Sequence, residues 1–142
     1  MTRIAAICTS FHRQDVERML EAAEKRAEEL DLDLRDVFWV PGCYEMPYAL
    51  KRIAEDDGIE GIVALGIIEK GETQHGEVMG HIVSEVLLRF QLKNDMPIGI
   101  GIIGPGAELE HLEPRLVPHA NSAVEALDHM LKGPQHWRQA DE

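Results

Sequence analysis

The chain has 142 residues, with 26 Asp and Glu against 14 Lys and Arg, a formal net charge of −12 and a hydrophobic share of 44 %. This length suits one domain, and the composition is that of a folded protein rather than a disordered acidic tail. Because a nucleic-acid-binding face needs clustered basic residues, the acidic balance argues against nucleic acid as a partner.

Apolar periodicity predicts alternating strands and helices. Continuous apolar runs predict four strands, and the third is apolar on both faces, as in a covered parallel sheet. The expected strands are 4–8, 37–40, 62–68 and 98–103. Apolar residues at three- and four-residue intervals predict the helices between and after these strands. The expected helices are about 16–30, 47–53, 75–90 and 122–131.

Turn and capping residues mark several expected boundaries. Pro41 and Gly42 end the second strand, and the Gly-Pro-Gly sequence at 104–106 breaks the fourth. Ser122 and Glu125 have the spacing of a capping box, which places the start of the last helix there.

The alternation of strands and helices predicts a three-layer α/β/α fold, with right-handed crossovers covering both faces of a four-stranded parallel sheet. We expect one domain over residues 1–133 and a C-terminal tail over residues 134–142. Ligands of such sheets bind beyond the carboxyl ends of the strands. The loops of interest are therefore 10–13, 41–45, 69–75 and 101–106.

Three of these loops carry side chains suited to binding or catalysis. Phe11 is either a residue that caps the core or a face on which a planar heterocycle stacks. Glu45 stands near a helix start, where the positive end of the helix favours a carboxylate in any case. The loop before His75 brings a glycine turn and a hydroxyl to a helix N-terminus, which can hold phosphate. There His75 is either a proton shuttle or a solvated histidine.

Two other motifs do not support a cofactor site. The residues from Gly99 to Gly104 match the dinucleotide-binding pattern, but they lie within the last expected strand and no helix follows them. His75 and His81 resemble the pair of a zinc-protease helix, but their spacing puts them about 240° apart around the helix. The two cysteines are too few for a disulfide framework or a zinc site. We expect no metal and no other cofactor.

The N-terminal residues lack the basic flank, long apolar stretch and cleavage site of a signal peptide. No segment approaches the ~20 apolar residues of a membrane helix. We therefore expect a cytoplasmic protein without membrane association.

Taken together, Phe11, the sequence Val-Pro-Gly-Cys-Tyr-Glu-Met-Pro at 40–47 and Gly-Ile-Ile-Glu-Lys-Gly-Glu-Thr-Gln-His at 66–75 strongly resemble the lumazine synthase family. The similarity runs in order from about residue 4 to residue 131. The two sequences at this separation are far more specific than either alone. The Gly-Pro-Gly sequence at 104–106 and the acidic composition resemble the archaeal branch.

The resemblance implies flavodoxin-like topology and a transferase of riboflavin biosynthesis. Its reaction condenses 5-amino-6-(D-ribitylamino)uracil with 3,4-dihydroxy-2-butanone 4-phosphate to 6,7-dimethyl-8-ribityllumazine, with release of phosphate, and needs neither a redox cofactor nor a metal. Such chemistry requires a site that orients the two substrates, an anion-binding site for the phosphate and a group that transfers protons. The loop at residues 71–75 has the residues for the last two.

The resemblance also implies a role for each site residue. His75 would transfer protons, Phe11 would stack on the pyrimidine, the backbone of Ile100 would contact the same ring, and Arg115 would bind phosphate. The other residues would line the ribityl pocket (Cys43, Tyr44, Glu45), present main-chain groups (Ile67, Ile68, Glu69) or hold the butanone phosphate (Glu72, Thr73).

Three positions depart from the family pattern. Ser122 stands where many members carry a lysine, Lys70 stands where many carry arginine, and Arg115 is offset by one residue from the bacterial pattern. From its sequence context alone, Arg115 would be a surface cation paired with Glu110 or Glu113.

Members of the family assemble as pentamers, some closed into an icosahedral shell, with the active site between subunits. The resemblance therefore implies a homo-oligomer in which Ile100 and Arg115 come from the neighbouring subunit, and either assembly is compatible with the sequence. The alternatives are an archaeal-type riboflavin synthase, against which Glu45 and the phosphate loop argue, and a noncatalytic flavin- or lumazine-binding shell protein. The charge of −12 would repel a phosphate substrate, and we interpret it as a halophile-like adaptation to a salt-rich cytoplasm.

Overall fold

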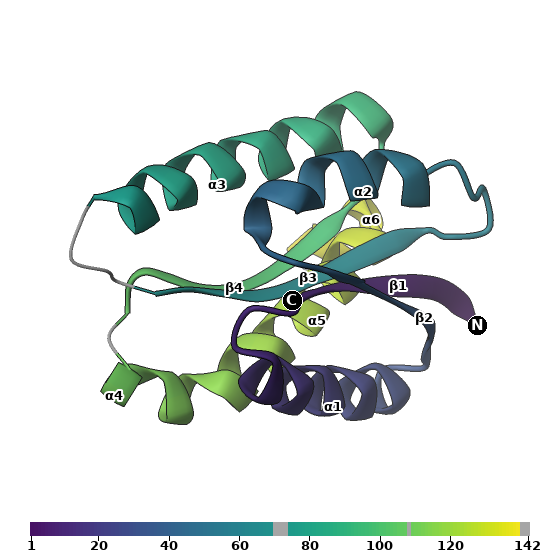
Figure 1. The fold of residues 1–142 in the computed structure, drawn as a ribbon. Coiled ribbons are helices and arrows are strands. Elements are labelled where there is room, and N and C mark those ends of the chain that lie inside the picture. The colour runs from purple at the N-terminus through teal and green to yellow at the C-terminus, as the bar shows by residue number, and fades with distance from the viewer. Residues whose placement is uncertain (70–73, 108, 140–142) are drawn as a thin grey trace.

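The computed structural model describes residues 1–69, 74–107 and 109–139, without the side chains of 105–107, 109 and 111. Its centre is a four-stranded sheet in which every neighbouring pair is parallel (Figure 1). The strands are β1 (Thr2–Thr9), β2 (Leu32–Val40), β3 (Gly61–Glu69) and β4 (Ile98–Ala107), in the order β2-β1-β3-β4. This arrangement confirms the predicted four-stranded parallel sheet.

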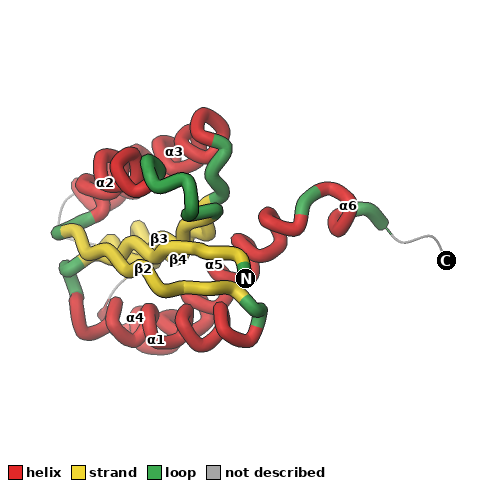
Figure 2. The backbone as a smooth tube through the Cα atoms, turned by 90° about the vertical axis from the view of Figure 1, so that its right-hand side faces the viewer, coloured by secondary structure: helices red, strands yellow, loops and turns green. Residues whose placement is uncertain are grey.

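Helices cover both faces of the sheet (Figures 1 and 2). One face carries α1 (Arg13–Glu29) and α5 (Leu116–Lys132), and the other carries α2 (Met46–Ile53) and α3 (His75–Asn94). Two apolar cores result, one on each side of the sheet. The three-layer α/β/α architecture is therefore confirmed.

The central strand β3 explains why two cores form. Successive side chains of a strand point to opposite faces, so Val63 and Leu65 join the core under α1 and α5, whereas Ile62 and Ala64 join the core under α2 and α3. All of β3 except its last residue, Glu69, is buried. The apolar run at residues 62–68 thus forms a strand that is covered on both faces, as predicted, and only its carboxyl end reaches the edge of the sheet.

The prediction for the start of the last helix is wrong. Helix α5 begins at Leu116, not at Ser122, and Ser122 lies inside the helix rather than at a cap. Leu116 and Ala120 are fully buried in the core with α1, so the apolar face of the helix begins one and a half turns earlier. Pro118 falls in the first turn, where its missing amide hydrogen has no intrahelical partner to lose.

The predicted break at residues 104–106 is also wrong, because β4 continues to Ala107. Gly104 has a φ of 103°, and a Cβ on it would lie 2.1 Å from the carbonyl oxygen of Ile68. Only glycine fits this close approach. The strand pairing shifts register between Ile67 and Glu69 at the same point. The glycine therefore bends the edge strand along β3 instead of ending it.

Short helical segments complete the described chain. They are η1 (Cys43–Glu45), α4 (Leu109–Leu112), η2 (Glu113–Arg115) and α6 (Pro134–Trp137). Helix α5 ends before Gly133, as predicted, but the expected tail contains α6, which extends away from the sheet in Figure 2. There the indole Nε1 of Trp137 donates a hydrogen bond to the carbonyl oxygen of His129 at 2.6 Å. No helix among the described residues is both long and apolar enough to cross a membrane.

Candidate active site

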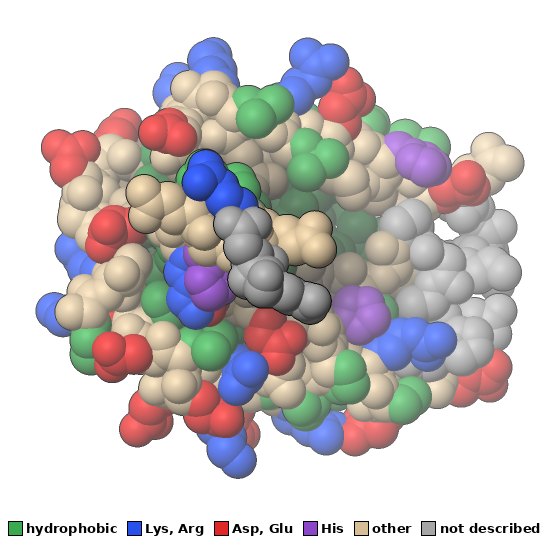
Figure 3. All heavy atoms as spheres, turned by 180° about the vertical axis from the view of Figure 1, so that it is seen from behind, with side chains coloured by type: hydrophobic (Ala, Val, Ile, Leu, Met, Phe, Trp, Pro, Cys, Tyr) green, Lys and Arg blue, Asp and Glu red, His purple; other side chains and the backbone are tan. Residues whose placement is uncertain are grey.

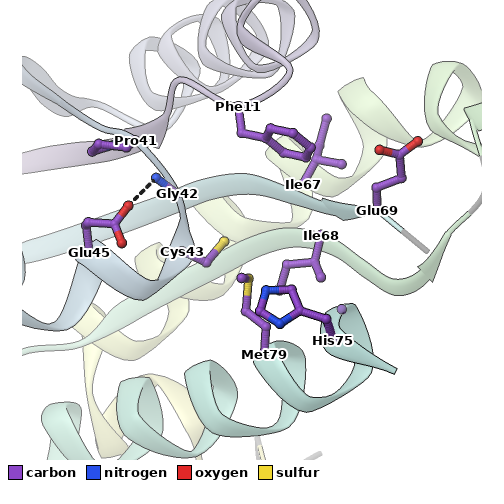
Figure 4. Close-up of a pocket in the computed structure, with 11 residues that line it drawn as sticks. Phe11, Pro41, Gly42, Cys43, Glu45, Ile67, Ile68, Glu69, His75 and Met79 are labelled. Carbon is purple, nitrogen blue, oxygen red and sulfur yellow. Dashed lines mark hydrogen bonds between the residues drawn. The ribbon is translucent and has the colours of Figure 1, made fainter. Parts of the chain in front are cut away.

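A cavity of about 490 Å³ opens at the carboxyl ends of β1, β2 and β3 (Figure 4). This is the edge at which ligands bind in parallel α/β sheets, and the volume lies in the range of small-molecule sites. The structure brings most of the residues implied by the family resemblance to this one cavity. They are Phe11, Cys43, Glu45, Ile67, Ile68, Glu69 and His75.

Phe11 reaches the cavity because the pairing of β1 with β2 continues past the strands. The amide of Ser10 donates to the carbonyl oxygen of Val40 at 2.8 Å, and the amide of Phe11 donates to that of Pro41 at 3.1 Å. The Phe11 ring is 51 % exposed, so it does not cap the core. It offers an open aromatic face on one side of the cavity, across from His75 (Figure 4).

Glu45 closes the turn that carries it. Its Oε1 accepts a hydrogen bond from the amide of Gly42 at 2.8 Å, and its own amide donates to the carbonyl oxygen of Gly42 at 3.2 Å. This contact fixes the carboxylate at the cavity wall. The capping role and the substrate-binding role are therefore compatible in one side chain, because Oε1 serves the turn and Oε2 makes no hydrogen bond or ion pair with another residue that the structure describes.

His75 begins α3 and lines the cavity beside Met79, one turn further along the helix. A Cβ on the next residue, Gly76, would lie 2.6 Å from the carbonyl oxygen of Glu69. The missing side chain of Gly76 therefore lets the start of α3 approach the end of β3. The Tyr44 ring contacts the His75 ring from outside the cavity lining.

Cys43 lines the cavity as a thiol rather than as a nucleophile. Burial raises the pKa of the Cys43 thiol to about 12, with a further contribution from the Glu45 carboxylate. A thiol becomes reactive only as the thiolate, so Cys43 contributes shape and an apolar surface near neutral pH.

Two of the remaining predicted site residues, Ile100 and Arg115, lie away from the cavity. Ile100 pairs with Ala64 on the edge strand β4 and is 36 % exposed, and Arg115 ends η2 on an exposed surface. Neither lines the cavity. Glu72 and Thr73 lie outside the described residues.

Sequence reasoning missed Met79 and Gly76, which line the cavity, and His12, which contacts a residue of its wall. Met79 has a recognisable signal, since a residue four positions after His75 lies on the same helix face. Gly76 has a weaker one, as glycine is unfavourable inside a helix and therefore indicates a close approach. The third is His12, whose Nε2 lies 3.3 Å from Oε2 of Glu69. No local pattern indicates a contact between residues 57 positions apart.

No group of three or more His, Cys, Asp or Glu side chains is placed to hold a metal ion in the described parts of the chain. The side chains at the cavity thus supply an aromatic face, two carboxylates, an imidazole and apolar walls. These groups can stack on a planar ring, accept hydrogen bonds and move protons.

A family model described as 6,7-dimethyl-8-ribityllumazine synthase matches residues 1–135. The chain belongs to this family. The match confirms the resemblance.

Curated members of the family are similar over nearly the whole chain. A 6,7-dimethyl-8-ribityllumazine synthase of Staphylothermus marinus is 35 % identical over 131 residues, which are 92 % of this chain and 87 % of the relative. That of Metallosphaera sedula is 34 % identical over 130 residues, 92 % of this chain and 86 % of the relative. That of Picrophilus torridus is 34 % identical over 132 residues, 93 % of this chain and 96 % of the relative.

Proposed function

We propose that the chain condenses 5-amino-6-(D-ribitylamino)uracil with 3,4-dihydroxy-2-butanone 4-phosphate to 6,7-dimethyl-8-ribityllumazine, releasing phosphate and water, in riboflavin biosynthesis. The observation that carries the proposal is the convergence of an open aromatic face, a carboxylate and an imidazole on one cavity in a chain of this family. The test is the appearance of the fluorescent lumazine when the purified protein is mixed with both substrates.

The pyrimidine would stack on Phe11, whose ring is half exposed at the cavity. Ile67 and Ile68 would complete an apolar slot for the flat ring, and the backbone at Glu69 would bind its polar edge. In such a slot a planar heterocycle is stabilised by dispersion attraction to the ring of Phe11 and by burial of its apolar surface. The ring system of the product would occupy the same position.

The ribityl chain would extend toward η1, between Cys43 and Glu45, with Tyr44 flanking it. Glu45 Oε2 would accept hydrogen bonds from the ribityl hydroxyls, because Oε1 is engaged by the amide of Gly42. A carboxylate accepts hydrogen bonds more strongly than a neutral oxygen. Its fixed geometry would orient the amines of the substrate toward His75.

His75 would transfer protons during the condensation. The first amine attacks the ketone carbon, and the resulting hydroxyl needs a proton to leave as water. Elimination of phosphate then requires removal of a proton from carbon, and ring closure by the second amine releases another water. An imidazole can both donate and accept a proton near neutral pH, and His75 faces the cavity across from the stacking ring (Figure 4).

The phosphate would bind at the N-terminus of α3, where backbone amides have no intrahelical partners. Glu72 and Thr73 precede that helix in the sequence and would contact the phosphate, together with Arg115. The net charge of −12 makes such a local anion site necessary, because the overall field repels phosphate.

We further propose a cytoplasmic homo-oligomer, either a pentamer or a larger icosahedral shell, in which a neighbouring subunit supplies Ile100 and Arg115. The exposure of both residues, away from the cavity of their own chain, supports this arrangement. The acidic surface would keep the assembly soluble in a salt-rich cytoplasm. Acidic side chains are spread over the face seen in Figure 3, with basic ones among them.

A further inference from the structure

His12 adopts a backbone conformation that is uncommon for residues other than glycine. Its φ of 57° and ψ of 44° place it in the left-handed region at the start of α1. Residues with a Cβ seldom adopt this conformation, and functional sites are among the places where it recurs. The carbonyl oxygen of His12 accepts a hydrogen bond from the amide of Val16 at 3.0 Å, so His12 is the N-cap of α1.

The imidazole of His12 connects the first loop to the end of β3. Nε2 lies 3.3 Å from Oε2 of Glu69, at hydrogen-bonding distance, and Nδ1 lies 3.9 Å from Oδ2 of Asp15. The side chain of His12 is only 19 % exposed, less than that of either carboxylate. A partly buried hydrogen bond to a carboxylate is stronger than the same contact in open solvent. The link therefore holds Glu69 in place at the cavity.

The same imidazole supports the Phe11 ring. The two ring centroids are 4.4 Å apart and the planes meet at 75°, an edge-to-face contact. Phe11 and Glu69 both line the cavity, whereas His12 does not. His12 thus lies behind two of the groups that face the ligand.

Charged side chains face His12 from two elements, α1 and β3. Asp15 approaches from α1 and Glu69 from β3. The adjacent cation Arg13 is engaged elsewhere, since its Nε lies 3.0 Å from Oε1 of Glu17 and its guanidinium lies 4.0 Å from the centroid of the Trp39 ring. The imidazole therefore has one hydrogen-bond partner among these groups, Glu69, while the Asp15 carboxylate lies further off at 3.9 Å.

We propose that His12 is a positioning residue that fixes the Glu69 carboxylate and the Phe11 ring relative to each other, and so sets the affinity of the cavity for the pyrimidine substrate. The inference rests on the proposed function, which assigns the stacking role to Phe11. It goes beyond that function by assigning a side-chain role to His12 and to the Glu69 carboxylate. Because His12 acts through these neighbours, it affects the KM for the pyrimidine and leaves the proton transfers at His75 unchanged.

Two substitutions separate the link from the backbone. In His12→Asn the side chain tolerates the left-handed conformation but ends near the position of Nδ1, too short to reach Glu69. In His12→Gln the amide extends to about the position of Nε2 and can donate to Glu69. We expect His12→Asn to raise the KM for the pyrimidine about threefold to tenfold, the effect of one lost hydrogen bond, with kcat within about twofold. We expect His12→Gln to recover part of the loss.

Further variants test the link itself. Glu69→Ala removes the acceptor and should raise the same KM, and the double variant with His12→Asn should raise it by less than the product of the two single effects, because both changes break one contact. The KM for the butanone phosphate should stay within about twofold. His136→Asn, in α6, is the control and should change neither constant. If His12 only stabilised the fold, His12→Asn would lower the melting temperature and the active fraction, which reduces the apparent kcat and not the KM.

Binding measurements keep this inference separate from the proposed function. Titration of the protein with 6,7-dimethyl-8-ribityllumazine, followed by its fluorescence, reports on the cavity without turnover. If the wild type binds the lumazine but gives no condensation, the proposed function fails, and weaker binding by His12→Asn still supports the positioning role. Equal KM and equal lumazine affinity in the wild type and His12→Asn would overturn it, as would additive effects in the double variant or a wild type that does not bind the lumazine. If His12→Asn does not fold, comparison of Glu69→Ala with the wild type provides the same test of the link.

Discussion

The rings of Tyr44 and His75 meet edge to face, with their centroids 5.9 Å apart and their planes at 84°. This contact joins η1, which follows β2, to the first turn of α3, which follows β3. The proposed proton-transfer residue is therefore supported laterally by an aromatic side chain that does not line the cavity. The contact with Tyr44 favours the orientation in which the imidazole of His75 faces the cavity.

Substitution of His75 tests the proposed proton transfer. We expect His75→Ala to slow turnover by about 10²-fold or less, because proton transfer is worth roughly 10²–10⁴ and positioning supplies much of the remaining rate. Steady-state lumazine formation at saturating substrates measures the effect. Tyr44→Phe keeps the ring contact and should retain nearly full kcat. A His75→Ala variant as fast as the wild type would remove His75 from the mechanism.

Phe11 should govern binding of the pyrimidine and not of the phosphate substrate. We expect Phe11→Ala to raise the KM for the pyrimidine about tenfold, since stacking of a base on an aromatic side chain is worth about 1–3 kcal/mol. Phe11→Trp retains a stacking face and is the matched control. The two KM values, measured separately for each substrate, decide the matter. An equal rise in both would indicate a general loss of the site.

The close approach at Gly76 makes a small substitution costly. In Gly76→Ala the new methyl group would lie 2.6 Å from the carbonyl oxygen of Glu69, so the start of α3 must move away from β3. We expect a loss of about 1–3 kcal/mol in the free energy of unfolding together with a lower kcat, because His75 moves with the helix. Urea unfolding and the condensation rate are the measurements.

Ser84→Ala is the control for that substitution. It lies on an exposed position of the same helix, and alanine is the better helix former. The variant should unfold at the same urea concentration as the wild type or at a slightly higher one. If Gly76→Ala behaved like Ser84→Ala in both assays, the close approach would have no part in placing His75.

The two buried thiols make stability depend on pH in the alkaline range. Burial raises the pKa of both Cys8 and Cys43 from 9.0 to about 12. Above about pH 9 the thiols ionise in the unfolded chain but stay protonated in the folded one, so stability that is fully present below pH 9 is lost as the pH rises toward 12. Each thiol removes about 1.4 kcal/mol per pH unit there.

Urea unfolding at pH 7, 9 and 10 measures this effect. The double variant Cys8→Ser with Cys43→Ser should show a shallower decline than the wild type between pH 9 and 10, whatever its stability at pH 7. Identical slopes would show that other groups cause the alkaline loss.

The acidic surface predicts tolerance of high salt. At 1 M salt the screening length falls to about 3 Å, which removes most of the repulsion among 26 acidic side chains. We therefore expect assembly and condensation activity to hold or rise from dilute buffer to about 1 M KCl. Light scattering and the condensation rate across this series are the measurements, and a steady decline in both would contradict the proposed adaptation.

Much of the fold follows from local patterns in the sequence. The apolar run of β3 predicts a doubly covered strand, and the alternation of strands and helices predicts the parallel sheet. The site follows from three loops, because the order β2-β1-β3 brings the residues after these strands to one edge. Phe11, Glu45 and His75, far apart in the sequence, meet there for that reason.

The remaining features depend on contacts that no local pattern records. The start of α5 was misplaced because Ser122 and Glu125 have the spacing of a capping box, although the helix already begins at the buried Leu116. The extension of β4 depends on the fit of Gly104 against Ile68. The link between His12 and Glu69 needs a residue in the left-handed conformation at position 12, which no local pattern in the sequence specifies.

The full enclosure of β3 has a consequence for how the cavity can move. Proteins open locally at their least buried elements, and central strands exchange their amide hydrogens last. Ile67 and Ile68 lie on such a strand, whereas Phe11 and Glu45 lie on surface turns. The cavity thus combines one rigid wall, formed by β3, with more mobile walls, formed by the turns. We expect the turns to adjust as the substrates change shape on the way to the product, while β3 keeps the reacting ring in one position.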